Sequence, residues 1–151
     1  MGHGVKLTEI VEKMDLKNLT PKVELAGREV NVPDVNRPAL QLVGFFDHFD
    51  SNRVQIIGNV EYNYLKTLTE DVKTKVYHEL LEYKLPCVIF SKSLQPDEIF
   101  LDLAEQHDVP VFNTANRTSA FTAELTRWLN VKLAPCISIH GVLVDVYGVG
   151  V

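Results

Sequence analysis

The sequence has 151 residues, of which 46% are hydrophobic and 23% charged, and its formal net charge is −5 at pH 7. This length allows one domain with a sizeable core, and the negative charge gives no basic footprint for nucleic acid. No apolar run approaches the roughly 18 residues of a membrane-spanning helix. The charged N-terminal stretch also has no apolar segment typical of a signal peptide. We therefore expect a globular protein that binds neither nucleic acid nor membranes.

The N-terminal part predicts one helix and one hairpin. Leu7 to Met14 places its apolar residues on one helical face. Val23 to Val32 alternates apolar and polar residues around a turn at 26–28, which is typical of a β-hairpin that ends at Pro33.

The next stretch reads as loop and short helix. Asp34 to Leu40 is predicted to be a loop, because Pro38 disfavours a helical conformation at Arg37. Gln41 to Asp50 predicts a short helix that runs into an aromatic-rich loop.

From Val54 onward the pattern becomes a regular alternation of strands and helices. The predicted strands are Val54–Gly58, Pro86–Ser91 and Val109–Asn113; the predicted helices are Val60–Lys66, Glu70–Tyr83 capped by Thr69, one beginning near Pro96, and Thr118–Leu133. Strands that alternate with helices indicate βαβ units on a parallel sheet. Short, continuous apolar strands indicate a sheet covered on both faces. The predicted fold is therefore a three-layer α/β/α domain with a mostly parallel sheet, over residues 1–133.

Polar residues follow the three predicted strands. In open α/β sheets ligands bind beyond the carboxyl ends of the strands, so the candidate ligand-binding residues are Asn59, Ser91, Lys92, Asn113 and Arg117. Amides, hydroxyls and two cations that face helix N-termini suit an anion or a nucleotide-sugar. The alternative interpretation is that these are ordinary turn and cap residues.

Other reactive residues give weaker signals. Cys87 and Cys136 lie in apolar runs and are interpreted as buried free thiols, which fits a cytoplasmic location. The spacing of Asp47, His48 and Asp50 matches no metal-ligand geometry, so no metal site is predicted.

The last stretch, Ile139 to Val151, reads IHGVLVDVYGVGV and predicts an apolar strand. Natural domains seldom end within such a strand. We therefore expect residues 134–151 to be a linker and strand that lead into a further domain. A lone histidine in an apolar strand, here His140, is most often structural.

Several segments together resemble the bifunctional HPr kinase/phosphorylase family. His140 to Val151 resembles the segment that leads into the family's nucleotide-binding loop. Asp34 to Leu40 resembles its Asp-x-Asn-Arg-Pro-Gly-Leu stretch, with Ala39 where glycine is usual. Further similar runs begin at Gly44, at Lys84 and at Lys132, so that the resemblance covers essentially residues 5–151.

The resemblance implies the N-terminal domain of an enzyme whose catalytic domain follows. In the family a GxxxxGKS loop holds ATP and Mg²⁺, and this sequence contains no such loop. The implied parent phosphorylates a serine of HPr from ATP or pyrophosphate and reverses the reaction by phosphorolysis, in bacterial carbon catabolite control. His140 matches the family's active-site histidine. The present chain is expected to hold no cofactor and to be inactive alone.

The family also implies partners and a fold. The partners would be HPr, the chain's own C-terminal catalytic domain and further copies in a hexamer, and the fold would resemble N-terminal domains of Mur ligases. Two functions remain open: a regulatory or assembly domain of the kinase/phosphorylase, or a stand-alone module that binds a phosphosugar or nucleotide-sugar.

Overall fold

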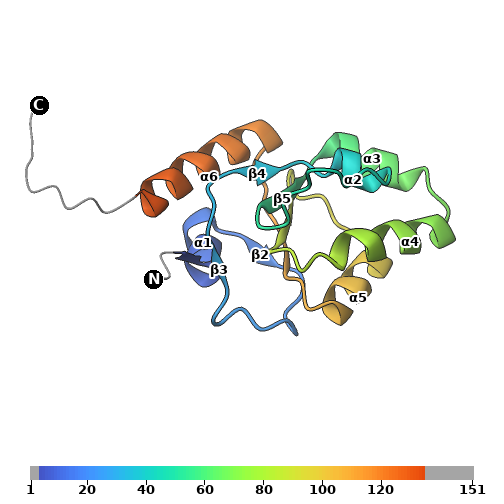
Figure 1. Cartoon of the computed structure of the whole chain (residues 1–151), viewed down its shortest axis with the longest axis horizontal. Coiled ribbons are helices and arrows are strands. Elements are labelled where there is room, and N and C mark those ends of the chain that lie inside the picture. Colours follow the sequence, from blue (N-terminus) through green and yellow to red (C-terminus); the bar gives the residue numbers. More distant parts are fainter. Residues whose placement is uncertain (1–3, 135–151) are drawn as a thin grey trace, which may run out of the picture.

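The computed structural model describes residues 4–134, which form one α/β domain (Figure 1). Its strands are β1 (Val5–Lys6), β2 (Lys17–Asn18), β3 (Glu29–Val30), β4 (Val35–Asn36), β5 (Val54–Ile57), β6 (Val88–Phe90) and β7 (Val111–Asn113). Its helices are α1 (Leu7–Met14), α2 (Ala39–Leu42), α3 (Asn59–Lys66), α4 (Glu70–Leu81), α5 (Glu98–Gln106) and α6 (Thr118–Leu133). No helix within these residues is both long and apolar enough to cross a membrane.

The central sheet has five strands in the order β2-β7-β6-β5-β4. Strands β4, β5, β6 and β7 run parallel to one another. Strand β2 pairs antiparallel with β7, with Lys17 opposite Asn113. Helices connect β5 to β6 and β6 to β7, as parallel pairing requires. The carboxyl ends of the parallel strands therefore meet at one edge of the sheet.

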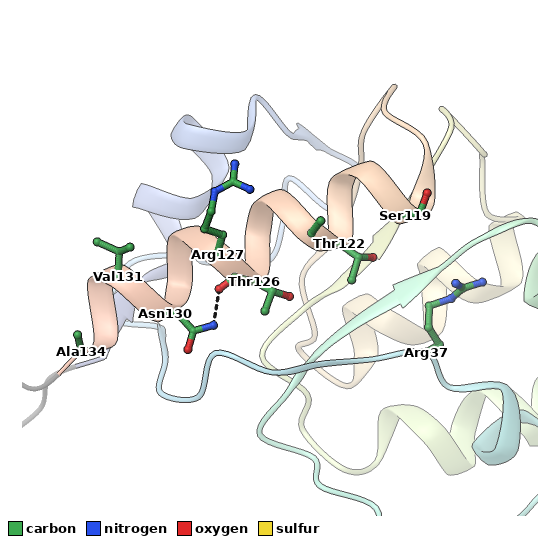
Figure 2. Close-up of a pocket in the computed structure, with 9 residues that line it drawn as sticks. Arg37, Ser119, Thr122, Thr126, Arg127, Asn130, Val131 and Ala134 are labelled. Atoms are coloured by element: carbon green, nitrogen blue, oxygen red, sulfur yellow. Dashed lines mark hydrogen bonds between the residues drawn. The ribbon is translucent and has the colours of Figure 1, made fainter.

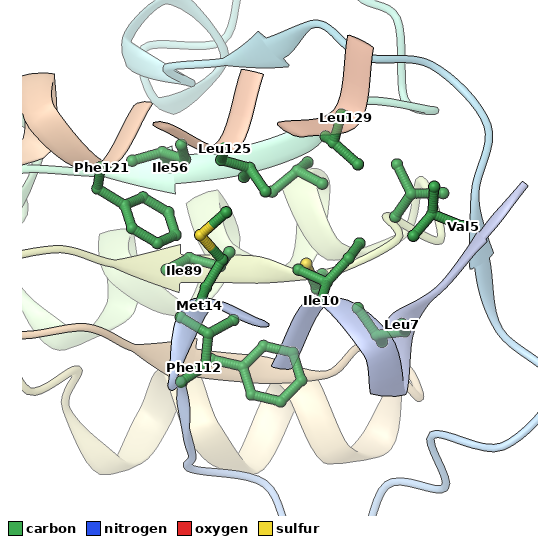
Figure 3. Packing of buried hydrophobic residues seen from close by; sticks show 14 residues of the cluster. Val5, Leu7, Ile10, Met14, Ile56, Ile89, Phe112, Phe121, Leu125 and Leu129 are labelled. Atoms are coloured by element: carbon green, nitrogen blue, oxygen red, sulfur yellow. The ribbon is translucent and has the colours of Figure 1, made fainter. Parts of the chain in front are cut away.

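Two hydrophobic cores lie on opposite faces of this sheet. Because side chains alternate along a strand, Ile56, Ile89 and Phe112 pack on one face against α1 and α6 (Figure 3). Their neighbours Ile57, Phe90 and Val111 pack on the other face with residues of α3, α4 and α5. The predicted three-layer α/β/α architecture with a mostly parallel sheet is confirmed.

The predicted hairpin at Val23–Val32 is wrong. The turn forms at Gly27, whose φ is 82°, but the segment before it is not a strand. Instead β3 pairs antiparallel with β1, so that Val30 lies opposite Val5 and both are buried. An alternating pattern indicates a half-buried strand but does not identify its partner.

The predicted loop at Asp34–Leu40 contains the short strand β4. The amide Nδ2 of Asn36 donates to Oε1 of Gln55 at 2.7 Å and to Oε1 of Gln41 at 3.1 Å. Gln55 is fully buried in β5, so these bonds satisfy a polar group inside the domain. Helix α2 follows at once and is shorter and earlier than the helix predicted from Gln41.

The stronger helix predictions are confirmed, with small shifts at their ends. The Thr69 and Asp97 side chains cap α4 and α5, accepting from the N–H groups of Val72 and Phe100. Cys87 is a fully buried free thiol, as predicted, and burial raises its pKa to about 12. Cys136 lies outside the described residues.

Candidate functional site

A cavity of about 450 Å³ lies at the carboxyl edge of the sheet. It is lined by residues from the ends of β4, β5, β6 and β7: Arg37, Asn59, Val60, Lys92, Arg117, Thr118 and Ser119. We call it the cationic cavity. The first residues of α3 and of α6 both contribute to it, because these helices begin directly after β5 and shortly after β7.

Three of the candidate residues, Asn59, Lys92 and Arg117, line the cationic cavity. The other two are buried in structural roles. Ser91 is fully buried, and its hydroxyl bonds to that of Thr118 and lies 3.4 Å from the carbonyl of Ile57. Asn113 is 5% exposed, and its amide donates to the carbonyl of Leu94 at 3.3 Å.

The prediction missed Arg37, which lines the same cavity. Its guanidinium Nη2 lies 2.7 Å from Oε1 of Glu61, whose side chain is only 3% exposed. The same carboxylate oxygen accepts the N–H of Gly58 at 2.9 Å. Arg37 directly follows β4, so its position at the end of a strand could have indicated that it lines the site. A strand of only two residues is, however, hard to recognise in a sequence.

Gly58 allows the two sides of the cavity to approach closely. A Cβ at this position would lie 2.6 Å from Oγ1 of Thr118 and 2.9 Å from Nη2 of Arg37. Side chains larger than hydrogen would therefore push apart the starts of α3 and α6.

The charge at this site is unbalanced. None of the lining residues carries a carboxylate. Among residues 4–134, Lys92 and Arg117 take part in no ion pair, whereas Arg37 pairs with Glu61. The arrangement therefore presents a net positive, solvent-accessible surface that suits an anion.

A second, larger cavity is a groove of about 1040 Å³ along α6 (Figure 2). Small and polar side chains of α6 line most of it, including Thr122, Thr126 and Asn130. Arg37 and Ser119 line both cavities and lie at the same end of the groove in Figure 2. The sequence did not predict this groove.

The one other predicted site residue is His140, and no metal site was predicted. Within residues 4–134, no group of three or more His, Cys, Asp or Glu side chains is placed to hold a metal ion. Residues 135–151 lie outside the described part of the chain. They include His140 and all of the predicted linker and final strand except Ala134, so the assignments there stay predictions.

Comparison with known proteins identifies the family. The family model described as "HPr Serine kinase N terminus" matches residues 5–129. HPr kinase/phosphorylase of Lachnoclostridium phytofermentans is 51% identical over 149 residues, which are 99% of this chain and 48% of that protein. The Caldicellulosiruptor bescii protein of the same name is 41% identical over 95% of this chain and 46% of its own length.

One solved structure has a related fold. The CBS and DRTGG domains of the regulatory region of Clostridium perfringens pyrophosphatase, complexed with the activator diadenosine tetraphosphate, superpose with a TM-score of 0.54. That match covers 86% of this chain and 50% of the other, at 16% identity, so it supports the fold alone. The predicted likeness to Mur-ligase domains stays a prediction.

The fold is that of an α/β domain whose strand ends are accessible to ligands. The family model assigns the chain to a particular family within this class. The chain belongs to the family of HPr serine kinase N-terminal domains. It spans about half the length of the curated relatives that it matches.

Proposed function

We propose that this chain is the noncatalytic N-terminal domain of a bifunctional enzyme that phosphorylates a serine of HPr. The observation that carries this proposal is the match of nearly the whole chain to only the first half of HPr kinase/phosphorylases. The parent enzyme uses ATP or pyrophosphate with Mg²⁺ and removes the phosphate by phosphorolysis. It acts in carbon catabolite control in the cytoplasm.

The physical support is that this domain has its own hydrophobic cores but not the loop that phosphoryl transfer needs. Residues 4–134 have their own two cores, and the sequence has no GxxxxGKS loop to cradle ATP phosphates. Phosphoryl transfer depends on positioning and on charge stabilisation around Mg-ATP. The domain therefore contributes regulation or assembly, including contacts in a hexamer, rather than the chemical step.

A transfer assay tests the catalytic half of this proposal. HPr is incubated with labelled ATP and either the 151-residue chain or a full-length enzyme that contains it. We expect labelled phosphoserine only with the full-length enzyme, and His140→Ala in that enzyme should greatly reduce transfer. Labelling of HPr by the 151-residue chain alone would contradict the noncatalytic role.

The assembly role has its own test. Light scattering and the transfer assay are applied to the full-length enzyme and to its C-terminal half. Loss of the N-terminal domain should change either the oligomeric state or the response of the enzyme to its effectors. Identical behaviour of both proteins would contradict the role.

A further inference from the structure

We propose that the cationic cavity binds the phosphate group of a small, non-nucleotide phosphorylated compound. This site goes beyond the kinase assignment and does not depend on it, since it lies wholly within residues 37–119 of the domain.

The first support is charge. The whole chain has 20 acidic and only 15 basic residues, yet Arg37, Lys92 and Arg117 line one cavity with no acidic lining residue. Of these three cations, only Arg37 has a carboxylate partner among the described residues. Like charges held close together repel one another, and a bound dianion would relieve that repulsion.

The second support is the convergence of two helix N-termini on the same cavity. Asn59 and Val60 begin α3, and Thr118 and Ser119 begin α6, and these residues all line the cavity. The residue before each helix, Gly58 or Arg117, offers no side chain to the first helical N–H groups, although Glu61 of α3 accepts the N–H of Gly58. By contrast, the Thr69 and Asp97 side chains cap α4 and α5. The first N–H groups of α6 therefore have no intrahelical acceptor and are available to phosphate oxygens, which the helix dipole also favours.

The third support is the loop that presents Lys92. Lys92 and the next residue, Ser93, both have a φ of 56°. This is the left-handed region of the backbone, which is unfavourable for residues other than glycine. The loop after β7 holds them there, because the Lys92 N–H donates to the carbonyl of Asn116 at 2.9 Å and that of Ser93 donates to Thr114 at 2.7 Å. Strained backbone of this kind is concentrated at ligand clamps and active sites. The two loops thus fix Lys92 and Arg117 relative to each other.

The lining residues also restrict the class of ligand. A volume of about 450 Å³ lies within the usual range of small-molecule pockets, so it holds more than an isolated ion. No aromatic side chain lines the cavity, and a nucleobase therefore has no stacking surface. The side chains of Asn59 and Ser119 instead offer hydrogen bonds to hydroxyl groups.

A titration of the 151-residue chain followed by amide NMR tests the site. Inorganic phosphate, glycerol 3-phosphate and AMP are each added at constant ionic strength maintained with chloride. We expect saturable shifts at the amides of residues 59–61, 92–93 and 117–120. Glycerol 3-phosphate should bind at least as tightly as phosphate, and AMP should gain nothing from its base.

Charge-neutralising variants identify the residues responsible. The double variant Lys92→Gln/Arg117→Gln should weaken phosphate binding about tenfold or more, the effect of losing at least one charge-assisted hydrogen bond. Lys75→Gln is the matched control, because Lys75 is an exposed cation of α4 that does not line the cavity. The thermal unfolding of all three proteins should be alike, since neither Lys92 nor Arg117 forms an ion pair with another of the residues 4–134.

Three results would overturn the proposal: shifts that grow linearly without saturation, equal weakening by Lys75→Gln, or binding of AMP far tighter than that of glycerol 3-phosphate. None of them bears on the kinase assignment, which depends on phosphate transfer by the full-length enzyme.

Discussion

The guanidinium of Arg37 lies 2.7 Å from the buried carboxylate of Glu61, and the two residues connect the end of β4 to the first turn of α3. Glu61 is the less exposed partner, at 3% against 40% for the Arg37 side chain. Its Oε1 also accepts the N–H of Gly58 at 2.9 Å. One carboxylate therefore caps a helix and holds a cation at the rim of the cationic cavity.

Replacement of Glu61 should destabilise the domain. Glu61→Ala leaves the buried N–H of Gly58 without its acceptor, and we expect the free energy of unfolding to fall by about 1–3 kcal/mol. Glu61→Gln retains an acceptor oxygen and should lose less. Urea unfolding of each variant measures the change. Glu12→Ala is the control, because Glu12 is exposed on α1 and pairs with no cation in the described part of the chain. The free energy of unfolding of Glu12→Ala should stay within about 0.5 kcal/mol of that of the parent chain. If Glu61→Ala lost no more stability than Glu12→Ala, the stabilising role of the Glu61 carboxylate would be refuted.

Two histidines meet where α4 and α5 end. Nε2 of His107 lies 2.8 Å from Nδ1 of His78, and their rings are nearly perpendicular. The pKa of His107 is lowered from its ordinary value, chiefly by desolvation and then by the charges of His78 and Lys84, against an opposing effect of Glu82. The folded state thus favours the neutral imidazole.

This arrangement predicts a stability that falls as the pH falls. Below the unfolded pKa of about 6.5 the unfolded chain takes up a proton at His107 that the folded chain resists. By linkage, stability therefore rises with pH through the window between the folded pKa and about 6.5. Urea unfolding between pH 5 and 7.5 should show this slope, and His107→Gln should reduce it.

A neighbouring substitution provides the control for the histidine pair. Gln106→Ala changes an exposed, uncharged residue of α5 and should leave the slope as it is. An NMR titration that places the pKa of His107 above 6.5 would show the sign to be wrong.

The sequence predicts the parts of the fold that depend on local pattern. Helices α1 and α6 and the cap Thr69 depend on residues close in sequence, and their positions were predicted correctly. Helix α5 was predicted to begin near Pro96, but Asp97 is its cap and the helix begins at Glu98. Strand β3 lies within the predicted hairpin, but its partner was wrong, because Val30 pairs with the distant Val5. The two-residue strands β1, β2 and β4 were not predicted, since each depends on a distant partner, as Lys17 does on Asn113. Side-chain pattern alone carries no signal for such pairing.

The candidate site was predicted only in part, because it too depends on contacts between residues distant in sequence. The strand-end rule placed Lys92 and Arg117 at the right edge of the sheet, but it could not tell which side chains turn inward. Ser91 continues the alternation of β6 and points into the domain, where it meets Thr118. Arg37 was missed because its strand, β4, has only two residues and an unremarkable sequence.

The close approach of Gly58 and Thr118 should be measurable as an energetic coupling. In Gly58→Ala the new Cβ would lie 2.6 Å from Oγ1 and 3.2 Å from Cγ2 of Thr118, and the Thr118 hydroxyl is held by buried Ser91. Overpacking of this kind costs about 1–3 kcal/mol. The contact with Arg37 is relieved more easily, because Nη2 is the end of a flexible side chain.

A double-mutant cycle isolates this contact. Thr118→Ala removes the two Thr118 atoms that the new methyl group would meet. Gly58→Ala/Thr118→Ala should therefore lose less stability than the sum of the two single variants, by at least about 0.5 kcal/mol. Gly58→Ala combined with Thr74→Ala is the matched control, because Thr74 lies on α4 and its hydroxyl donates to the carbonyl of Glu70 in the same helix. That pair should be additive. Additivity in both cycles would mean that the starts of α3 and α6 move apart freely, and that Gly58 does not set the width of the cationic cavity.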